Sequence, residues 1–201
     1  MTPAKRLFDI LVAFILGVIL LIPVAVTALL ILIRDGRPVF YISERMKTPT
    51  EGFRLAKFRT MKTVASDSGV SGGDKADRIT RTGHFLRRTR LDEVPQLWNV
   101  LKGDISFVGP RPPLRQYVER FPEIYREVLK SRLGITGLAS VHFHAHEEWL
   151  LARARTTQET DEIYSCACVP RKARLDLIYQ KNQNLCMDMM IMLKTVLKSL
   201  R

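Results

Sequence analysis

The chain has 201 residues, of which 32 are Lys or Arg and 20 are Asp or Glu, giving a formal net charge of +12. This length supports one domain plus an appendage, and the charge suits an anionic partner such as nucleic acid, lipid headgroups or a phosphorylated small molecule. The three cysteines, Cys166, Cys168 and Cys186, are odd in number, so the sequence excludes a disulfide-stapled secreted scaffold and favours a reducing compartment.

An uncharged apolar run from Ile10 to Ile33 dominates the N-terminal part. As a helix rising about 1.5 Å per residue it would reach about 36 Å, enough for a bilayer core of about 30 Å. Pro23 lies near its middle and predicts a break. Basic residues flank both ends and favour the cytoplasmic side for both: Lys5, Arg6, Arg34 and Arg37. A re-entrant helix–break–helix satisfies that pattern, but a kinked span fits the segment alone equally well.

Two short strands are expected next, at 39–42 and 53–58, around a turn that contains proline and glycine. On the second strand Phe53, Leu55 and Lys57 share one face, so Lys57 projects from the same side as an apolar patch. A simple surface lysine is the alternative. Residues 62–78 are small and polar and predict a loop long enough to act as a lid.

The central stretch 87–96, RRTRLDEVPQ, places Asp92 and Glu93 after three arginines and before a helix that Pro95 can open. Helices are expected over 82–90 and 95–101. The arginines and the helix N-terminus favour anions, so a carboxylate here should stay ionised and could hold a cation or attack an electrophile. Neighbouring side chains point in different directions, so the two carboxylates should have different tasks. An isolated Asp-Glu pair would more simply be an acidic helix start.

Prolines on both sides stiffen the backbone around Arg111. A guanidinium held in this way loses less entropy when it meets a phosphate, although pairing with a nearby acid would explain the turn as well. Residues 123–133 have amphipathic helical spacing. Residues 134–139, GITGLA, predict a glycine-bracketed turn that is too generic to be a phosphate loop.

Three histidines, His142, His144 and His146, recur at period two and would share one face of a strand. With Cys166 and Cys168 downstream they suggest zinc, but the spacing matches no standard zinc module and the segment between them looks helical. A polar strand face near the substrate is the favoured interpretation.

From Lys172 onward the chain is helical in character. An apolar stripe recurs at helical spacing through Leu185, Met189, Leu193, Val196 and Leu200, with Lys194, Lys198 and Arg201 beside it. Such a stripe usually packs on a core, and cationic residues beside it also suit a helix at a membrane interface. The two uses are compatible.

Together these segments resemble the small monotopic bacterial phosphoglycosyl transferases, which initiate glycoconjugate assembly on a polyprenyl phosphate. The resemblance rests on KRLFD at 5–9, KFRTM at 57–61, LDEVPQLWNVLKGD at 91–104, SFVGPRP at 106–112 and GITGL at 134–138. These motifs span most of the chain in the family's order, and the central one is highly specific.

The resemblance implies site residues and a cofactor. Asp92 matches the family's nucleophile and Glu93 its partner in a catalytic dyad. Lys57, Arg87 and Arg111 match positions that contact phosphate or orient the dyad. Mg²⁺ is implied as the required ion, with Asp92 as its protein ligand.

Some positions depart from the family pattern. The helix break there has a Ser-Pro pair, where this chain has Ile22 before Pro23. Leu133 replaces a proline and Ser140 a glutamine around the GITGL motif, and the histidine segment is unusual. At the break the polar contribution of the serine is missing. The departures around GITGL and in the histidine segment lie in regions associated with sugar recognition, so they leave the identity of the sugar open and not the chemistry.

The sequence thus predicts an α+β, mostly helical enzyme with a small β-hairpin. Residues 1–34 form a re-entrant membrane helix broken near Pro23, and residues 35–201 a compact catalytic domain on the cytoplasmic side of a bacterial inner membrane. The expected reaction, implied by the resemblance, transfers a phosphosugar from a UDP-sugar to undecaprenyl phosphate through a covalent Asp92 intermediate, releasing UMP. This would be the first membrane step of glycoconjugate or exopolysaccharide assembly. Membrane lipids are expected partners, nucleic acid is not, and a homodimer stays open.

Two alternatives remain at this stage. A bitopic, non-enzymatic membrane protein that binds polyanions would need neither Asp92 nor Glu93 and would show strongly salt-dependent binding. A metal-dependent hydrolase of lipid phosphates or nucleotides would use His142, His144 and His146 as ligands and water as acceptor.

Overall fold

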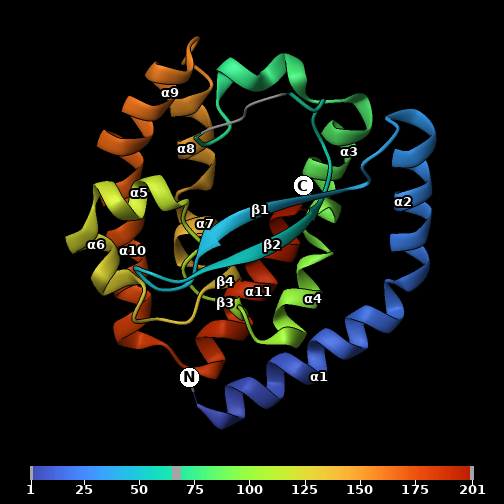
Figure 1. Cartoon of the computed structure of the whole chain (residues 1–201). Helices are drawn as coiled ribbons and strands as arrows, with labels where there is room; N and C mark the ends of the chain where they lie inside the picture. The colour runs from blue at the N-terminus through green and yellow to red at the C-terminus, as the bar shows by residue number, and fades with distance from the viewer. Residues whose placement is uncertain (1, 65–68, 200–201) are drawn as a thin grey trace.

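The computed structural model describes residues 2–64 and 69–199, and these are mostly helical with two small two-stranded sheets (Figure 1). The helices are α1 Pro3–Ile19, α2 Leu21–Arg34, α3 Arg81–Thr89, α4 Gln96–Lys102, α5 Arg115–Arg120, α6 Pro122–Val128, α7 Leu138–His142, α8 His144–Leu151, α9 Thr157–Ile163, α10 Val169–Asn182 and α11 Leu185–Ser199, with the shorter turns η1 Gly73–Arg78, η2 Leu91–Glu93 and η3 Tyr164–Cys168. The strands are β1 Phe40–Met46, β2 Gly52–Phe58, β3 Ser106–Val108 and β4 Gly134–Thr136. The expected mostly helical α+β class is confirmed.

The apolar N-terminal run forms two helices, α1 and α2, that bend by 60° where they meet. The bend lies at Leu20, about one turn before Pro23, which sits in the first turn of α2. Pro23 has no N–H to donate to the carbonyl of Ile19, and its ring crowds that carbonyl, so the break falls N-terminal to the proline itself. Within the described residues no single helix could cross a bilayer, whereas the bent pair has the length and composition of a broken span or a re-entrant loop.

Most apolar side chains of the bent pair point away from the rest of the protein. Phe14, Ile22 and Ile33 are 64%, 74% and 73% exposed. Figure 1 shows α1 and α2 along the edge of the molecule, covering only one side of it. A continuous apolar surface of this kind is rare on a soluble monomer and indicates a surface that contacts something apolar.

The first turn of α1 is tied to the rest of the fold by two basic residues. Lys5 Nζ lies 2.5 Å from Asp188 Oδ2 on α11 and 2.9 Å from the Tyr179 hydroxyl on α10. The guanidinium of Arg6 donates to the carbonyls of Val100 and Leu101 and so caps the C-terminal end of α4. These contacts fix the bent pair to the helix that follows the central carboxylates.

The two expected strands form an antiparallel hairpin, and the first strand ends four residues later than expected, at Met46. Phe40 pairs with Phe58 and Met46 with Gly52. The loop expected over 62–78 is only partly irregular, because η1 forms its C-terminal part. Its residues 65–68 lie outside the described residues, as do Leu200 and Arg201 of the C-terminal stripe.

A second, parallel sheet pairs β3 with β4. The turn expected over 134–139 is therefore wrong in its first half, which is a strand. The two segments approach so closely that a Cβ on Gly109 would lie 2.0 Å from the carbonyl oxygen of Arg132. Glycine at this position lets the strand pair run directly into the Arg111 turn.

The expected helix over 123–133 is shorter than predicted and ends at Val128. The strand expected for the histidine segment is wrong, because residues 138–151 form α7 and α8. Ala139 and Phe143 are both buried four residues apart, so their helical spacing decided the conformation over the period-two pattern of the histidines.

The C-terminal helices α10 and α11 are confirmed, but the apolar stripe of α11 does not pack on the core. Leu193 and Val196 are 59% and 55% exposed, while Asp188 and Ile191 form the buried face. The larger core joins α1, α4, the hairpin, β3, α5, α6 and α10, and α11 contributes Ile191 to it. A smaller core joins α2, β2 and α3 through Ile31, Phe58 and Leu86.

Candidate active site

The two central carboxylates lie on a short 3-10 turn, η2, between α3 and α4. Helix α3 ends at Thr89, and Arg90 then adopts a left-handed backbone with φ of 59°. A non-glycine residue there costs roughly 1–2 kcal/mol, a strain that is typical of functional sites. Pro95 follows and caps α4 as the sequence predicted. The reversal at Arg90 therefore holds Asp92 and Glu93 in a rigid turn between two helices.

Glu93 is clamped by two cations. Its Oε1 lies 2.5 Å from Arg111 Nη2 and 3.2 Å from Lys57 Nζ, and its side chain is 10% exposed. Burial alone would raise the pKa of Glu93, but Arg111 and Lys57 outweigh burial and hold the pKa of this carboxyl well below its usual range. Glu93 therefore stays ionised and orients the two phosphate-binding candidates. The pairing of Arg111 with a nearby acid, one of the two expectations for its turn, is confirmed.

Asp92 is equally buried but has a different environment. Its Oδ1 has no hydrogen-bond partner within the described residues. Burial raises the pKa of Asp92, and the charge of Glu93 raises it further, against Lys57, Arg111 and Arg87. The expected division of tasks thus has a physical basis, because one carboxylate is paired and the other keeps a free oxygen. The sequence predicted that the nearby cations would keep a carboxylate here ionised. This holds for Glu93, whose pKa is lowered, but the pKa of Asp92 is raised.

Lys57 and Arg87 reach the site from the hairpin and from α3. Burial lowers the pKa of Lys57 and the charge of Glu93 opposes this. Arg87 Nε donates to Thr60 Oγ1 at 2.9 Å, which fixes its guanidinium within electrostatic range of Asp92. All five residues predicted from the sequence for the catalytic and phosphate-binding roles therefore lie together in the structure.

Three further polar residues belong to this site, and only Arg45 had no place in the sequence prediction. Arg90 is one of the three arginines before the carboxylates, and His144 lies in the segment expected near the substrate. Arg45 lies on β1 and lines the same cavity as Lys57. It is within electrostatic range of Tyr164, Arg111 and Glu93. Arg90 Nη1 lies 3.9 Å from Glu93 Oε1. Burial and the nearby Arg90 and Arg111 lower the pKa of His144 to about 3, so its imidazole is neutral. Arg45 could have been found by extending the first strand, because it alternates with Tyr41, which pairs with Lys57.

A cavity of about 1240 Å³ surrounds these groups. The hairpin, α3, η2, α8 and α10 all contribute to its walls, and Asp92, Glu93, Arg111 and His144 line it. Its size is sufficient for a ligand larger than a single sugar or phosphate. The cations near the two carboxylates favour an anionic part of such a ligand.

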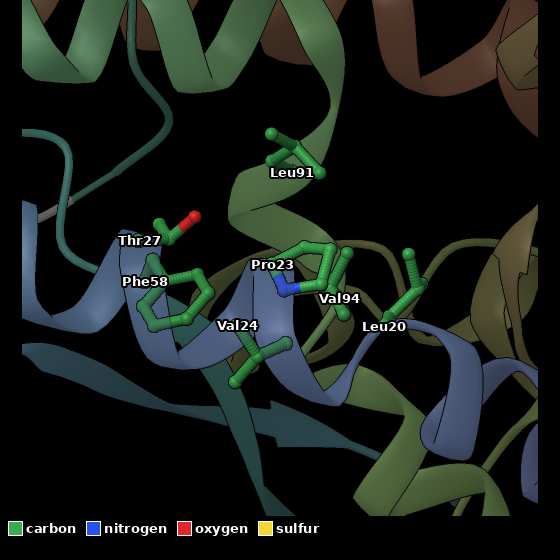
Figure 2. A pocket seen from close by; sticks show the side chains of 7 residues that line it. All are labelled: Leu20, Pro23, Val24, Thr27, Phe58, Leu91 and Val94. Carbon is green, nitrogen blue, oxygen red and sulfur yellow. The ribbon is translucent and has the colours of Figure 1, made fainter.

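The bend of the N-terminal helices lies directly against the segment that carries the carboxylates. Figure 2 shows a small apolar pocket lined by Leu20, Pro23 and Val24 of the bend and by Leu91 and Val94, the residues on either side of Asp92 and Glu93. Phe58 of β2 and Thr27 of α2 complete it. These contacts couple the position of the helix bend to the position of the carboxylates.

The histidines do not form a metal centre. Within residues 2–64 and 69–199 no three His, Cys, Asp or Glu side chains come together as a metal site. His146 lies between the rings of Phe143 and Trp149, and His144 Nε2 is 3.3 Å from Glu148. A Mg²⁺ site does not need such a cluster of protein ligands, because the ion is often held by one or two carboxylates together with substrate phosphates. The unpartnered Oδ1 of Asp92 fits that single-carboxylate role.

The arrangement suits the transfer of a phosphorylated group. A buried carboxylate with a free oxygen is a nucleophile or a cation ligand, and the cations around it can neutralise a diphosphate that would otherwise repel it. A polyanion-binding surface would not require two buried carboxylates, whose burial is costly. The alternative of a metal-dependent hydrolase loses its expected ligands, because His142, His144 and His146 form no metal site within the described residues.

Comparison with known proteins agrees with this chemistry. The family model described as Bacterial sugar transferase matches residues 1–201. A UDP-N-acetylgalactosamine-undecaprenyl-phosphate N-acetylgalactosaminephosphotransferase of Aeromonas hydrophila is 35% identical over 96% of this chain and 42% of its own length. An uncharacterized sugar transferase of Bacillus subtilis is 35% identical over 98% and 87%. A UDP-glucose:undecaprenyl-phosphate glucose-1-phosphate transferase of Klebsiella pneumoniae is 31% identical over 96% and 39%. The chain thus spans less than half the length of the first and third relatives.

Proposed function

The chain belongs to the bacterial sugar transferase family, and we propose that it transfers a phosphosugar from a UDP-sugar to undecaprenyl phosphate, releasing UMP. The relatives named for this reaction support the substrate classes. The product would be a polyprenyl-diphosphate sugar, the starting lipid for a glycoconjugate or exopolysaccharide.

The observation that carries this proposal is the unequal pair of carboxylates. Glu93 is held by Arg111 and Lys57, whereas Asp92 keeps a buried, unpartnered oxygen in the same cavity. In the first step Asp92 attacks the β-phosphorus of the donor, and the bond from that phosphorus to the bridging oxygen breaks, so UMP leaves. In the second step an oxygen of the lipid phosphate attacks the same phosphorus, and the bond to Asp92 breaks. Neither step requires water or an added oxidant.

The surrounding residues have supporting tasks. Lys57, Arg111 and Arg87 would bind the diphosphate and stabilise charge that develops on the departing phosphate. Glu93 would keep Lys57 and Arg111 in place between the two steps. Two steps allow a soluble nucleotide and a membrane lipid to use one site in turn.

Mg²⁺ belongs to this proposal as the cofactor, with Asp92 and the donor's phosphates as its ligands. When bound, the ion would offset the diphosphate charge. The residues of the chain would hold the donor in register with Asp92 and keep Glu93 from competing for the ion, since Glu93 is already paired.

We place the protein at the cytoplasmic face of a bacterial inner membrane, with residues 1–34 as a re-entrant helix and 35–201 as the catalytic domain. The exposed apolar side chains of α1 and α2 and the basic residues at both ends of the pair support this topology. The contacts in Figure 2 would then keep Asp92 at the height of a lipid headgroup.

The reaction is tested by incubating the detergent-solubilised protein with undecaprenyl phosphate and, in turn, UDP-glucose, UDP-galactose and UDP-N-acetylgalactosamine. UMP and a lipid-linked sugar should form together from at least one donor. Release of free sugar phosphate in place of the lipid product would identify a hydrolase.

The topology is tested with a single cysteine at Thr2 in a chain that lacks Cys166, Cys168 and Cys186. In intact spheroplasts this cysteine should resist a membrane-impermeant thiol reagent, because both ends of the bent pair lie inside. Strong labelling from outside would show a true span.

A further inference from the structure

One wall of the cavity carries a second group of polar side chains that the transfer steps do not use. Glu147 on α8, Tyr164 on η3 and Lys172 on α10 are joined, with Lys172 Nζ 2.7 Å from Glu147 Oε1 and 3.2 Å from the Tyr164 hydroxyl. Asp176 lies one turn further along α10. All four line the cavity that contains Asp92 and Glu93.

This wall adjoins the phosphate-binding candidates. Arg111, the partner of Glu93, lies within electrostatic range of Glu147. Arg45 lines the same cavity and lies within electrostatic range of both Tyr164 and Glu93. A donor whose diphosphate lies at Arg111 would therefore extend its next group along this wall.

Two polar atoms on the wall lack partners. Asp176 is 7% exposed, and within the described part of the chain its Oδ1 accepts no hydrogen bond. Ser140 Oγ, on the neighbouring helix α7, also lines the cavity without a described partner. An unsatisfied buried carboxylate oxygen costs free energy that a ligand hydroxyl would recover. Burial raises the pKa of Asp176 to about 7, although the charge of Lys172 acts to lower it.

We propose that Glu147, Lys172 and Asp176 form the subsite that binds the sugar ring of the donor and selects among sugars. This inference rests on the proposed function. Sugar hydroxyls both donate and accept hydrogen bonds, so they suit a wall with two carboxylates and an ammonium group. Glu147 and Lys172 offset each other's charge, so this wall offers a phosphate no net positive charge, and its polar groups would disfavour a prenyl chain.

The order of the reaction supports the same assignment. The sugar stays in the site through both steps, whereas UMP leaves and the lipid phosphate enters between them. A group that stays can be held by buried residues, while groups that exchange need the open side of the cavity. Lys172 has one N–H left after Glu147 and Tyr164, and Asp176 has a free acceptor, so the wall can distinguish the orientation of a hydroxyl.

The test compares donors that differ only in the sugar. kcat/KM for UMP release is measured for UDP-glucose, UDP-galactose and UDP-N-acetylgalactosamine with the full chain and with Asp176→Asn and Glu147→Gln. Calorimetry gives the Kd of UDP, which lacks the sugar. For at least one of the two variants, kcat/KM for the best donor should fall about tenfold or more, and the ratio between donors should change. The Kd of UDP should stay within about twofold.

Asp9→Asn is the matched control. Asp9 is also buried, with an unpartnered Oδ2, but it lies outside the cavity beneath β3. It should change kcat/KM by the same factor for every donor. The inference is overturned if both cavity variants also act uniformly on all donors, or if they weaken UDP as much as the UDP-sugar. If the unaltered chain releases UMP from none of the donors, the proposed function itself fails, and the subsite falls with it.

Discussion

Replacing Glu93 with glutamine tests how the carboxylate pair is organised. The substitution keeps the shape of the side chain but removes the negative charge between Arg111 and Lys57. Leaving buried cations without their counter-charge typically costs about 3–5 kcal/mol. Asp92 remains nearby and offsets part of that cost, so we expect a loss near the lower end, about 3 kcal/mol, in the free energy of unfolding.

The same substitution should alter the titration of Asp92. Burial is the largest cause of the raised pKa of Asp92, and the charge of Glu93 is the next. Removing that charge lowers the pKa of Asp92. Since Asp92 must be ionised to attack phosphorus, activity falls as the pH drops through its pKa. In Glu93→Gln the acid limb of kcat/KM should therefore move to lower pH, while the maximal rate falls because Arg111 and Lys57 are no longer held.

The assay is UMP release as a function of pH, together with denaturant unfolding monitored by circular dichroism in the same detergent. Glu44→Gln is the matched control, because Glu44 pairs with Arg115 on an exposed surface. Because this pair is screened by water, the control should leave both the free energy of unfolding and the acid limb nearly unchanged. An acid limb that stays in place or moves to higher pH in Glu93→Gln would refute the coupling between the two carboxylates.

Other predictions concern pH, packing and metal. His144 has its pKa lowered from 6.5 to about 3 by burial and nearby cations, so only the unfolded state binds its proton in that window. The free energy of unfolding should fall as the pH drops from about 6.5 towards 3, and His144→Gln should flatten this dependence in denaturant titrations; an unchanged slope would contradict it. Lys5→Met leaves Asp188 buried without its cation and should lower the free energy of unfolding by about 3–5 kcal/mol. The control Lys194→Met, at an exposed position, should lower it by less than about 0.5 kcal/mol, and equal losses would contradict a stabilising role for the Lys5–Asp188 pair. Chelation with EDTA should abolish UMP release and added Mg²⁺ should restore it; full activity in excess chelator would exclude a magnesium requirement.

Much of the site could be predicted because its residues lie in local patterns. Asp92 and Glu93 are adjacent in sequence, and the strand alternation of Phe53, Leu55 and Lys57 placed Lys57 on the inner face. The rest depends on distant contacts. Glu147, Lys172 and Asp176 come together only when α8 packs near α10, and nothing in their spacing indicates this.

The expectations that were wrong have the same origin. The apolar stripe of α11 has the helical spacing that usually packs on a core. In the structure Asp188 is buried because Lys5, from the other end of the chain, pairs with it, and the stripe faces outward. In the histidine segment, packing of Ala139 and Phe143 on the core overrode a local period of two.

The central claim is that Asp92 becomes covalently attached to the phosphosugar, and it can be measured directly. The protein is mixed with its UDP-sugar in the absence of lipid phosphate, and UMP and the intact mass of the chain are followed. We expect a burst of about one UMP per active site, with a gain of one phosphosugar mass located at Asp92, and neither in Asp92→Asn. Because an acyl phosphate is labile, the burst is the primary readout. UMP that forms only when lipid phosphate is present, with no burst at any donor concentration, would contradict the covalent mechanism.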